Sequence, residues 1–257
     1  MMAVVIVITA YLASLLTLFS GFGLGTLLMP IIAIFFPVAI AIAMTAFVHL
    51  LNNIFKLLTL WKSINWYVSL YFGIPALLAA IPGAWILTNL STQAMIAQYV
   101  VFNLAAEITP IKLVIGVLLI VFSGIEFFSI SNKLNISKDL LPFGGILSGF
   151  FGGLSGHQGA FRSAFLLHAD LNPQQFIATN AAIATLVDIT RLIIYGINIQ
   201  LLFNEVDTIL VIVASCAAFA GVLTGTLGIH KVTIHRIQTL VAYMLLGIGI
   251  LLSLGIL

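Results

Sequence analysis

Arg162 lies inside a long apolar stretch, about one helical turn after a glycine-rich sequence that runs from Gly152 to Gly159. A helix that begins near Gly159 would present free backbone N–H groups and the positive end of its dipole beside the guanidinium. Such a combination can hold an oxyanion through paired hydrogen bonds. We therefore predict an anion-binding site formed by Arg162, Gln158, His157 and the amides of Gly156 and Gly159. The alternatives for Arg162 are an ion pair with Asp170 or a side chain that snorkels to the cytoplasmic surface.

A second glycine-interrupted apolar sequence, Ser20 to Gly25, lies at the matching place in the first half of the chain. Backbone at membrane depth must be buried in protein or face a watery cavity, because lipid cannot satisfy its polar groups. Paired breaks of this kind mark the central binding sites of transporters. We expect Gly23, Gly25 and Thr26 to close the anion site from the opposite side.

Two stripes of polar residues follow helical spacing in the segments after the two breaks. Each stripe falls on one helix face, and that face is too polar for lipid. We expect the stripes to line a cavity between the two halves of the chain. They comprise Thr45, His49, Asn52 and Lys56 in the first half, and Asn180, Asp188 and Arg191 in the second.

We assign these polar residues to two roles. We expect the side-chain amides of the two asparagines to contact the substrate. The ionisable groups are expected to act in gating or coupling, with His49 and His157 as candidate proton carriers. The alternatives are snorkelling for the cations, a structural Asp188–Arg191 pair and neutral histidines hydrogen-bonded between helices. The substrate contacts are Asn52 and Asn180, and the gating or coupling residues are His49, Lys56, Asp188 and Arg191.

The composition places the chain in a bilayer. Of its 257 residues, 62% are hydrophobic and 6% are charged, against roughly 25% charged in soluble domains. A net charge of +2, with the positive residues scattered, argues against nucleic acid as a partner. Cofactors are not expected: neither a cluster with metal-ligand spacing nor a phosphate-binding loop is found, which also argues against an ATP-driven pump.

Six apolar runs have the length of a single membrane span, roughly 20 residues. Two longer runs, Ala3 to Phe36 and Leu140 to Ala169, contain the glycine breaks and either cross once with a kink or fold back as hairpins. The single spans are Pro37 to Trp61, Trp66 to Leu87, Pro110 to Ser129, Asn172 to Gly196, Thr208 to Leu227 and Ile237 to Ile256.

The loop charges favour hairpins. If both long runs fold back, five of the six basic loop residues fall on one side and only Lys112 lies near the other, as the positive-inside tendency requires. The basic side is then cytoplasmic, and both termini face outward, as do the connections that carry Glu107, Glu205 and Asp207. The five residues are Lys62, Lys133, Lys138, Lys231 and Arg236.

We predict an all-α, polytopic membrane helix bundle of two inverted repeats, residues 1–130 and 139–257. Each repeat is a glycine-broken hairpin, of half depth or full depth, followed by three transmembrane helices. Pairs such as Ser14 with Ser148 and Gly25 with Gly159 support the repeat weakly, because apolar stretches also match by chance. Topology supports it more than identity does.

The sequence Gly21-Phe-Gly-Leu-Gly25, followed by Pro30, resembles the repeated signature of the sulfite exporter TauE/SafE family of anion transporters. The stretch from Gly221 to Gly225, with Gly228 after it, is similar to the end of that family's second half. The second break departs from the pattern, since Ala164 stands where the first half has Pro30. The resemblance covers nearly the whole chain. It implies export or uptake of sulfite, taurine, sulfoacetate or related anions across the cytoplasmic membrane. With the two inverted repeats, we predict a non-enzymatic transporter that works by alternating access and holds the anion between the two hairpins.

Two rival functions and several partners stay open. A passive anion channel would use the same lining. An intramembrane serine hydrolase would use Ser155, in a sequence that resembles the rhomboid nucleophile motif, with His49 or His168 as base. The expected partners are a small anionic substrate and the lipid bilayer, with a coupling proton or sodium and a homodimer left open.

Overall fold

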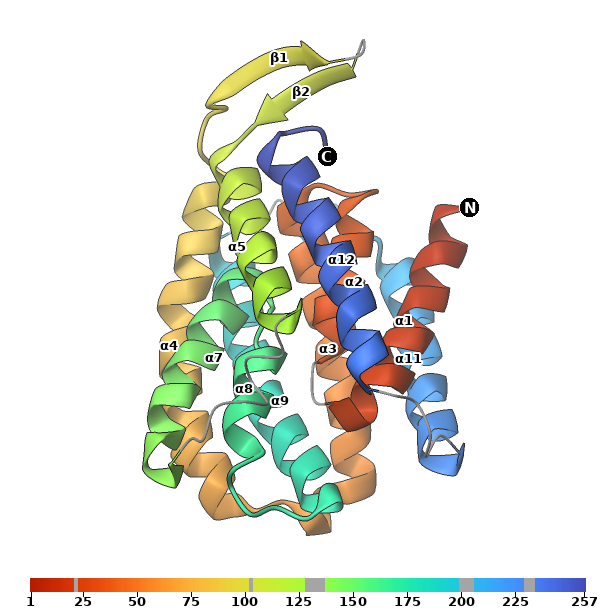
Figure 1. Cartoon of the computed structure of the whole chain (residues 1–257), viewed down its shortest axis with the longest axis vertical. Coiled ribbons are helices and arrows are strands. Elements are labelled where there is room, and N and C mark those ends of the chain that lie inside the picture. Colours follow the sequence, from red (N-terminus) through yellow and green to blue (C-terminus); the bar gives the residue numbers. More distant parts are fainter. Residues whose placement is uncertain (21–22, 102–103, 128–136, 199–205, 229–233) are drawn as a thin grey trace.

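The computed structural model describes residues 1–20, 23–101, 104–127, 137–198, 206–228 and 234–257 as a helical bundle with a small β-hairpin at one end (Figure 1). The helices are α1 (Met2–Ser20), α2 (Leu24–Ala33), α3 (Val38–Leu60), α4 (Trp66–Ser91), α5 (Pro110–Phe127), α7 (Leu141–Ser155), α8 (Gly159–Leu166), α9 (Pro173–Asn198), α11 (Thr208–Gly228) and α12 (Ile234–Ser253). The short 3-10 turns η1 (Trp61–Ser63) and η2 (Lys138–Leu140) precede α4 and α7.

Within the described residues, five helices are long and apolar enough to cross a membrane. They are α3, α4, α5, α9 and α11, and their bounds lie close to the spans that the apolar runs predict. Proline opens α5 at Pro110 and α9 at Pro173, where the missing N–H has no intrahelical acceptor to lose. The predicted all-α, polytopic membrane bundle is confirmed.

Both long apolar runs fold back as hairpins with one long and one short arm. The arm α1 has 19 residues and α2 has 10, which corresponds to lengths of about 28 and 15 Å. The second hairpin pairs the 15-residue α7 with the eight-residue α8. Figure 1 shows each short arm returning toward the end of the bundle from which its long arm started.

The second break is narrower than the predicted Gly152 to Gly159. Helix α7 continues through Gly152 and Gly153, and only three residues, from Gly156 to Gln158, separate α7 from α8. Gly156 ends α7 in the left-handed conformation with φ 79°, which glycine adopts without steric cost. In the first hairpin, Gly23 precedes α2 with φ 84°, and residues 21 and 22 lie outside the described part.

Glycines of α7 allow α4 to approach closely. A methyl group on Gly145, Gly149 or Gly153 would lie 2.3, 1.9 or 2.3 Å from a backbone oxygen of α4. These glycines recur every fourth residue, which lets helix backbones approach closely, and this packing explains why Gly153 stays helical instead of joining the break. Gly221 of α11 has the same relation to α1, because its methyl group would lie 2.4 Å from the oxygen of Tyr11.

The helix pairs of the bundle come in matching sets. Helix α4 packs on α7, and α11 packs on α1, while α3 pairs with α9 and α5 with α12. In Figure 1, α1 and α7 run in opposite directions, as do α3 and α9, and α5 and α12. The first residue of α2 corresponds to that of α8, and the first residue of α3 to that of α9, at one common spacing along the chain. This spacing is one residue longer than the one that pairs Gly25 with Gly159.

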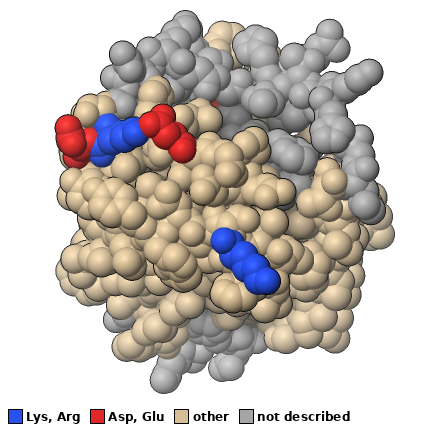
Figure 2. Space-filling model, turned by 90° about the horizontal axis from the view of Figure 1, so that it is seen from below, with Lys and Arg blue, Asp and Glu red and all other residues tan. Residues whose placement is uncertain are grey.

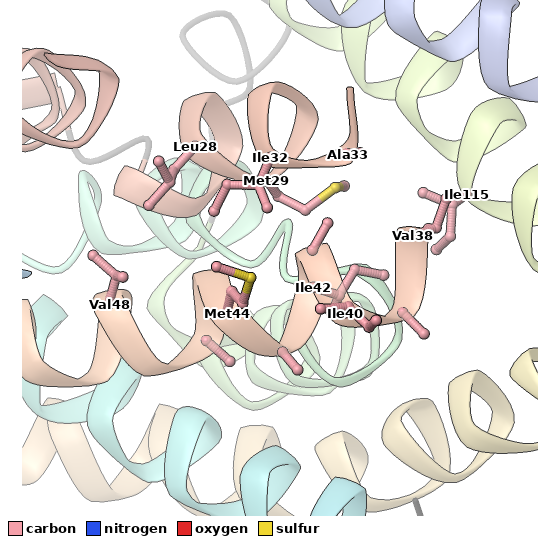
Figure 3. Close-up of a cluster of buried hydrophobic side chains, with 14 of the residues drawn as sticks. Leu28, Met29, Ile32, Ala33, Val38, Ile40, Ile42, Met44, Val48 and Ile115 are labelled. Carbon is pink, nitrogen blue, oxygen red and sulfur yellow. The ribbon is translucent and has the colours of Figure 1, made fainter. Parts of the chain in front are cut away.

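The short arm α2 is surrounded by protein. Leu28, Met29 and Ile32 are almost fully buried, and Figure 3 shows them facing residues of α3, with Ile115 of α5 nearby. Since α2 is apolar on all sides, this burial fixes it inside the bundle. The break that precedes it is thereby held at the centre of the molecule.

A two-stranded hairpin forms within the connection that follows α4. Strand β1 (Ala97–Val101) pairs antiparallel with β2 (Leu104–Ile108). The amide of Glu107 donates to the oxygen of Gly255 at 2.8 Å, and the Tyr99 hydroxyl donates to the oxygen of Leu254 at 2.5 Å. These bonds tie the hairpin to the end of α12, near the carboxyl terminus (Figure 1).

The described basic loop residues lie at the expected ends of the bundle. The turn η1, with Lys62, and the turn η2, with Lys138, are at the end seen in Figure 2. The first turn of α5, with Lys112, is at the opposite end. Lys133, Lys231 and the side chain of Arg236 lie outside the described part. The cytoplasmic assignment of this end and the outward placement of both termini stay predictions.

Candidate functional site

The two glycine breaks meet at the centre of the bundle. A methyl group on Gly23 would lie 3.6 Å from the Cα of Gly159 and 3.5 Å from His49 Nε2. One on Gly25 would lie 3.3 Å from the oxygen of Gly156 and 3.6 Å from Thr45 Cγ2. The amino-terminal ends of α2 and α8 therefore face the same space, as the sequence predicts.

No side chain of an N-cap residue closes either of these helix ends. The N-cap of α2 is Gly23, which has no side chain, and the side chain of Gln158, the N-cap of α8, makes no capping hydrogen bond. The first N–H groups of a helix have no intrahelical acceptor, and the dipole gives that end partial positive charge. Two such ends in contact favour a negative ligand.

Arg162 is 1% exposed and contacts neutral groups. Its Nε donates to Asn180 Oδ1, and its NH1 donates to Gln158 Oε1 at 2.8 Å. Asp170 is paired with Lys138 at the surface, so the Arg162–Asp170 alternative is wrong, and burial excludes snorkelling. Among the described residues, no carboxylate lies within ion-pair distance of Arg162.

Lys56 is a second cation of the same interior. It is 7% exposed, and within the described part of the chain its ammonium group makes no hydrogen bond or ion pair. It is close enough to Arg162 for the two charges to repel each other. Snorkelling of Lys56 stays an alternative. Neither Lys56 nor Arg162 forms an ion pair with a described carboxylate, although Asp188 attracts Arg162 from beyond ion-pair distance.

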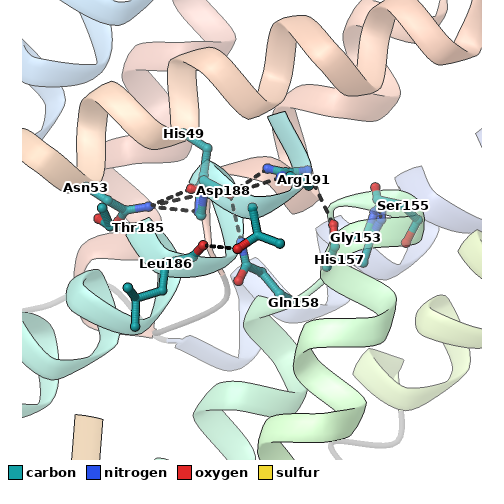
Figure 4. Close-up of polar contacts among 12 residues, drawn as sticks. His49, Asn53, Gly153, Ser155, His157, Gln158, Thr185, Leu186, Asp188 and Arg191 are labelled. Carbon is teal, nitrogen blue, oxygen red and sulfur yellow. Dashed lines mark hydrogen bonds and ion pairs between the residues drawn. The ribbon is translucent and has the colours of Figure 1, made fainter. Parts of the chain in front are cut away.

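Asp188 is the centre of a hydrogen-bonded network between α3 and α9 (Figure 4). Its Oδ1 accepts from Nε and NH2 of Arg191 at 3.0 and 2.8 Å, and from Gln158 Nε2 at 3.0 Å. Its Oδ2 lies 2.6 Å from His49 Nδ1 and 3.5 Å from Asn53 Nδ2. The predicted Asp188–Arg191 pair is confirmed, and the fully buried Arg191 neither snorkels nor faces an entrance.

Gln158 connects this network to Arg162. Its side-chain oxygen, Oε1, accepts from Arg162, and its side-chain nitrogen, Nε2, donates to Asp188. Because each amide atom has a partner that fits only one orientation, the side chain is held in place between the cation and the carboxylate. A ligand that displaces Gln158 from Arg162 would therefore also disturb the hydrogen bond between Gln158 and Asp188.

Three buried polar atoms near the breaks have no partner within the described part of the chain. They are Thr45 Oγ1, Asn52 Nδ2 and His157 Nε2. Asn52 accepts a hydrogen bond from Ser14 through its other amide atom at 3.1 Å. Unsatisfied polar atoms are rare in protein interiors, so these positions fit the wall of a ligand site.

His157 and Thr26 complete the predicted set. His157 Nδ1 lies 3.0 Å from the oxygen of Ser155. Because a carbonyl only accepts, Nδ1 carries the proton and Nε2 is the open acceptor. Thr26 is buried in the first turn of α2, where its amide lies 3.3 Å from the oxygen of Gly23.

Asn53 and Glu126 are not among the site residues that the sequence predicts. Asn53 contacts His49 at 3.1 Å, and its place four residues after His49 was the available signal. Glu126 is the one carboxylate in the predicted span Pro110 to Ser129, and charge at membrane depth was again a signal. Tyr195, which donates to the oxygen of Gly153, was also missed and carried no such signal.

Ser155 is not arranged as a nucleophile. Its hydroxyl donates to the oxygen of Phe151 at 3.0 Å, and His157 contacts its carbonyl oxygen, not its hydroxyl. His168 Nδ1 is bound to the oxygen of Ala164. In the described part of the chain, the hydrogen bond between nucleophile and base that a serine hydrolase requires is absent.

The fold and the site together define a polytopic membrane transport protein with a cationic centre. Comparison with protein families identifies which one: the profile described as sulfite exporter TauE/SafE matches residues 6–252. The chain belongs to this family, as the resemblance of its glycine motifs implied, and it is a membrane transporter and not an enzyme. Comparison with curated proteins and with solved structures gave no match.

Proposed function

We propose that this transporter moves small sulfur-containing oxyanions or organosulfonates, of the sulfite, taurine or sulfoacetate type, across the cytoplasmic membrane. The anion binds between the two hairpins, at the ends of α2 and α8. The observation that carries this proposal is the pair of buried cations, Arg162 and Lys56, without a described carboxylate partner. Buried charges that lack a partner are costly, and an anionic ligand supplies the missing charge.

The groups around the proposed site suit a sulfonate or sulfite head. Arg162 uses two of its five N–H donors on neutral amides, so the rest of its planar fork can bind two oxygens of one anion. The first amides of α2 and α8 supply further donors, and Lys56 supplies a second positive charge. Asn52 contributes an N–H that has no described acceptor.

Alternating access is supported by the matching packing of the two halves. If residues 1–130 and 139–257 are inverted repeats, exchanging them converts the α4–α7 pair into the α11–α1 pair and keeps α3 with α9. The His49–Asp188 contact, at 2.6 Å, joins the two halves beside the anion site. In this proposal it acts as the gate, which Gln158 connects to the bound anion.

Ligand-induced thermal stabilisation of the purified protein tests the binding site. Sulfite, sulfate, taurine and sulfoacetate are titrated separately, since a ligand at 100 times its Kd stabilises by about 2.7 kcal/mol. Wild type is expected to respond to at least one sulfur oxyanion. Arg162→Lys keeps the charge but loses the planar fork, and we expect it to bind that anion at least about 10-fold more weakly.

The matched control is Lys62→Arg, at an exposed basic residue of the turn η1, which should leave the affinity unchanged. Equal affinity of wild type and Arg162→Lys would overturn the proposed site.

Counterflow in proteoliposomes separates the transporter from the channel reading. A carrier shows saturable exchange of labelled for unlabelled anion, whereas unitary currents in a bilayer recording would favour the channel.

A further inference from the structure

Glu126, near the end of α5, is a buried carboxyl that the anion site does not use. It is 2% exposed, and within the described residues neither carboxylate oxygen has a hydrogen-bond partner. Asp188, the other buried acid, is hydrogen-bonded at both oxygens. The remaining described acids, Glu107, Asp139, Asp170 and Asp207, are exposed at the ends of helices and strands.

An ionised carboxylate without a partner is strongly disfavoured inside a membrane protein, because it loses its hydration without compensation. Binding a proton removes the charge, and the neutral acid is then tolerated. Ionisable groups that persist at membrane depth commonly belong to ion or proton pathways. The surroundings of Glu126 show what such a proton could be coupled to.

Glu126 lies next to the aromatic layer that borders the anion site. We define this layer as Phe122, Phe151, Phe161 and the imidazole of His157. The Phe122 ring stacks on the His157 ring with centroids 5.2 Å apart, and it meets the rings of Phe151 and Phe161 edge-on at 5.6 and 5.8 Å. Glu126 follows Phe122 by four residues on α5, so both side chains lie on one helix face.

His157, a member of this layer, offers a proton acceptor. Its Nε2 is buried and has no described partner, while its Nδ1 faces the oxygen of Ser155. His157 belongs to the break that precedes α8 and Arg162. Phe122 therefore connects the two groups, because its ring stacks on His157 and Glu126 follows it by one turn on the same face of α5.

Other charged or titratable groups near α5 leave Glu126 without a described partner. Helix α5 packs mainly on α12, with α3 and α4 alongside. The side chains of His235 and Arg236, in the first turn of α12, lie outside the described part. The titratable residues described on these elements are Lys112 of α5, His49 and Lys56 of α3, Tyr67 and Tyr71 of α4 and Tyr243 of α12, and none forms a hydrogen bond or ion pair with Glu126.

We propose that Glu126 is the proton-binding residue of this transporter, so that a proton on its carboxyl accompanies the anion through the transport cycle. The proton joins a carboxylate oxygen from water on one side of the membrane and leaves to water on the other. His157, stacked on Phe122, is the positioning residue that links the proton to the anion site. This inference rests on the proposed anion transport.

The test compares two kinds of flux in proteoliposomes that contain Glu126→Gln. Counterflow, with anion on both sides and no pH gradient, needs binding and alternation but no net proton movement. We expect Glu126→Gln to retain counterflow within about twofold of wild type. Accumulation driven by an imposed pH gradient should fall to the level of protein-free liposomes.

The matched control is Glu107→Gln, which removes an exposed carboxyl of β2 and should leave both fluxes unchanged. If wild type shows no counterflow, the proposed function fails and not this inference. Accumulation by Glu126→Gln that equals wild type, or wild-type transport that ignores the pH gradient, would overturn the role of Glu126.

A binding measurement covers the case in which Glu126→Gln does not reconstitute. Anion is added to purified protein in weakly buffered detergent solution, and a pH-indicator dye reports proton uptake. Wild type and Glu126→Asp, which keeps the carboxyl, should each take up about one proton per anion bound. Absence of proton uptake by wild type, despite anion binding, would contradict the proposal.

Discussion

The two halves of the protein differ in charge at a pair of equivalent positions. Counted from the first residues of α3 and α9, Asn53 occupies the position of Asp188, and Lys56 that of Arg191. In the second half, the carboxylate neutralises the guanidinium one turn away. In the first half an amide replaces it, and Lys56 has no described carboxylate partner.

The short arms of the hairpins differ in a similar way. Arg162 is the fourth residue of α8, and the fourth residue of α2 is Leu27. Each half therefore contributes one cation to the centre, from a different element. The backbone packing follows a twofold pattern and the charges do not, which favours the proposal of one anion site between the two halves over two copies of it.

We expect the greatest loss of stability when the neutral Asp188–Arg191 pair of the second half is broken. Asp188→Asn keeps the size of the side chain but leaves Arg191 buried without its carboxylate, which should destabilise the protein by about 3–5 kcal/mol. Asp170→Asn, in the exposed pair with Lys138, should cost less than about 1 kcal/mol. Thermal unfolding in detergent measures both, and equal melting temperatures would contradict the assigned role of Asp188.

The next effect tests whether the packing is indeed equivalent in the two halves. Gly149→Ala and Gly221→Ala each place a methyl group within 2.4 Å of a backbone oxygen on the facing helix. Each should destabilise by about 1–3 kcal/mol. Gly247→Ala, where a methyl group meets nothing within 4 Å, is the control and should not lower the melting temperature.

A glycine run in an apolar sequence does not by itself reveal whether it breaks a helix or allows close packing. The run from Gly152 to Gly159 does both, and the position of α4 decides where packing ends and the break begins. The spans were predictable because length and apolarity suffice. The hairpins followed from the loop charges, since folding back places the described Lys62 and Lys138 at one end.

Charged residues at membrane depth identified the region of the site but not its pairing. Sequence spacing linked Asp188 with Arg191 because they lie on one helix. It could not show that His49 and Gln158 converge on the same carboxylate, since these contacts join different elements. The β-hairpin was missed, and its hydrogen bond to Gly255 after α12 joins segments that are far apart in the sequence.

The smallest effect concerns the amide that replaces the carboxylate. Asn53 makes long contacts, at 3.1 Å to His49 Nδ1 and 3.5 Å to Asp188 Oδ2. Asn53→Ala should therefore lower stability by only about 0.5–1.5 kcal/mol, and anion affinity should change little. A loss as large as that of Asp188→Asn would show that the two positions are equivalent in energy as well as in place.

In the proposed function, the unpaired cation of the first half, Lys56, binds the transported anion. Its most direct test is the equilibrium affinity of purified Lys56→Met for sulfite, with the exposed Lys62→Met as the matched control. A hydrogen bond to a charged group contributes about 1.5–3 kcal/mol, so we predict that Lys56→Met binds sulfite roughly 10- to 100-fold more weakly while its melting temperature does not fall. Wild-type affinity in Lys56→Met, equal to that of Lys62→Met, would contradict the account.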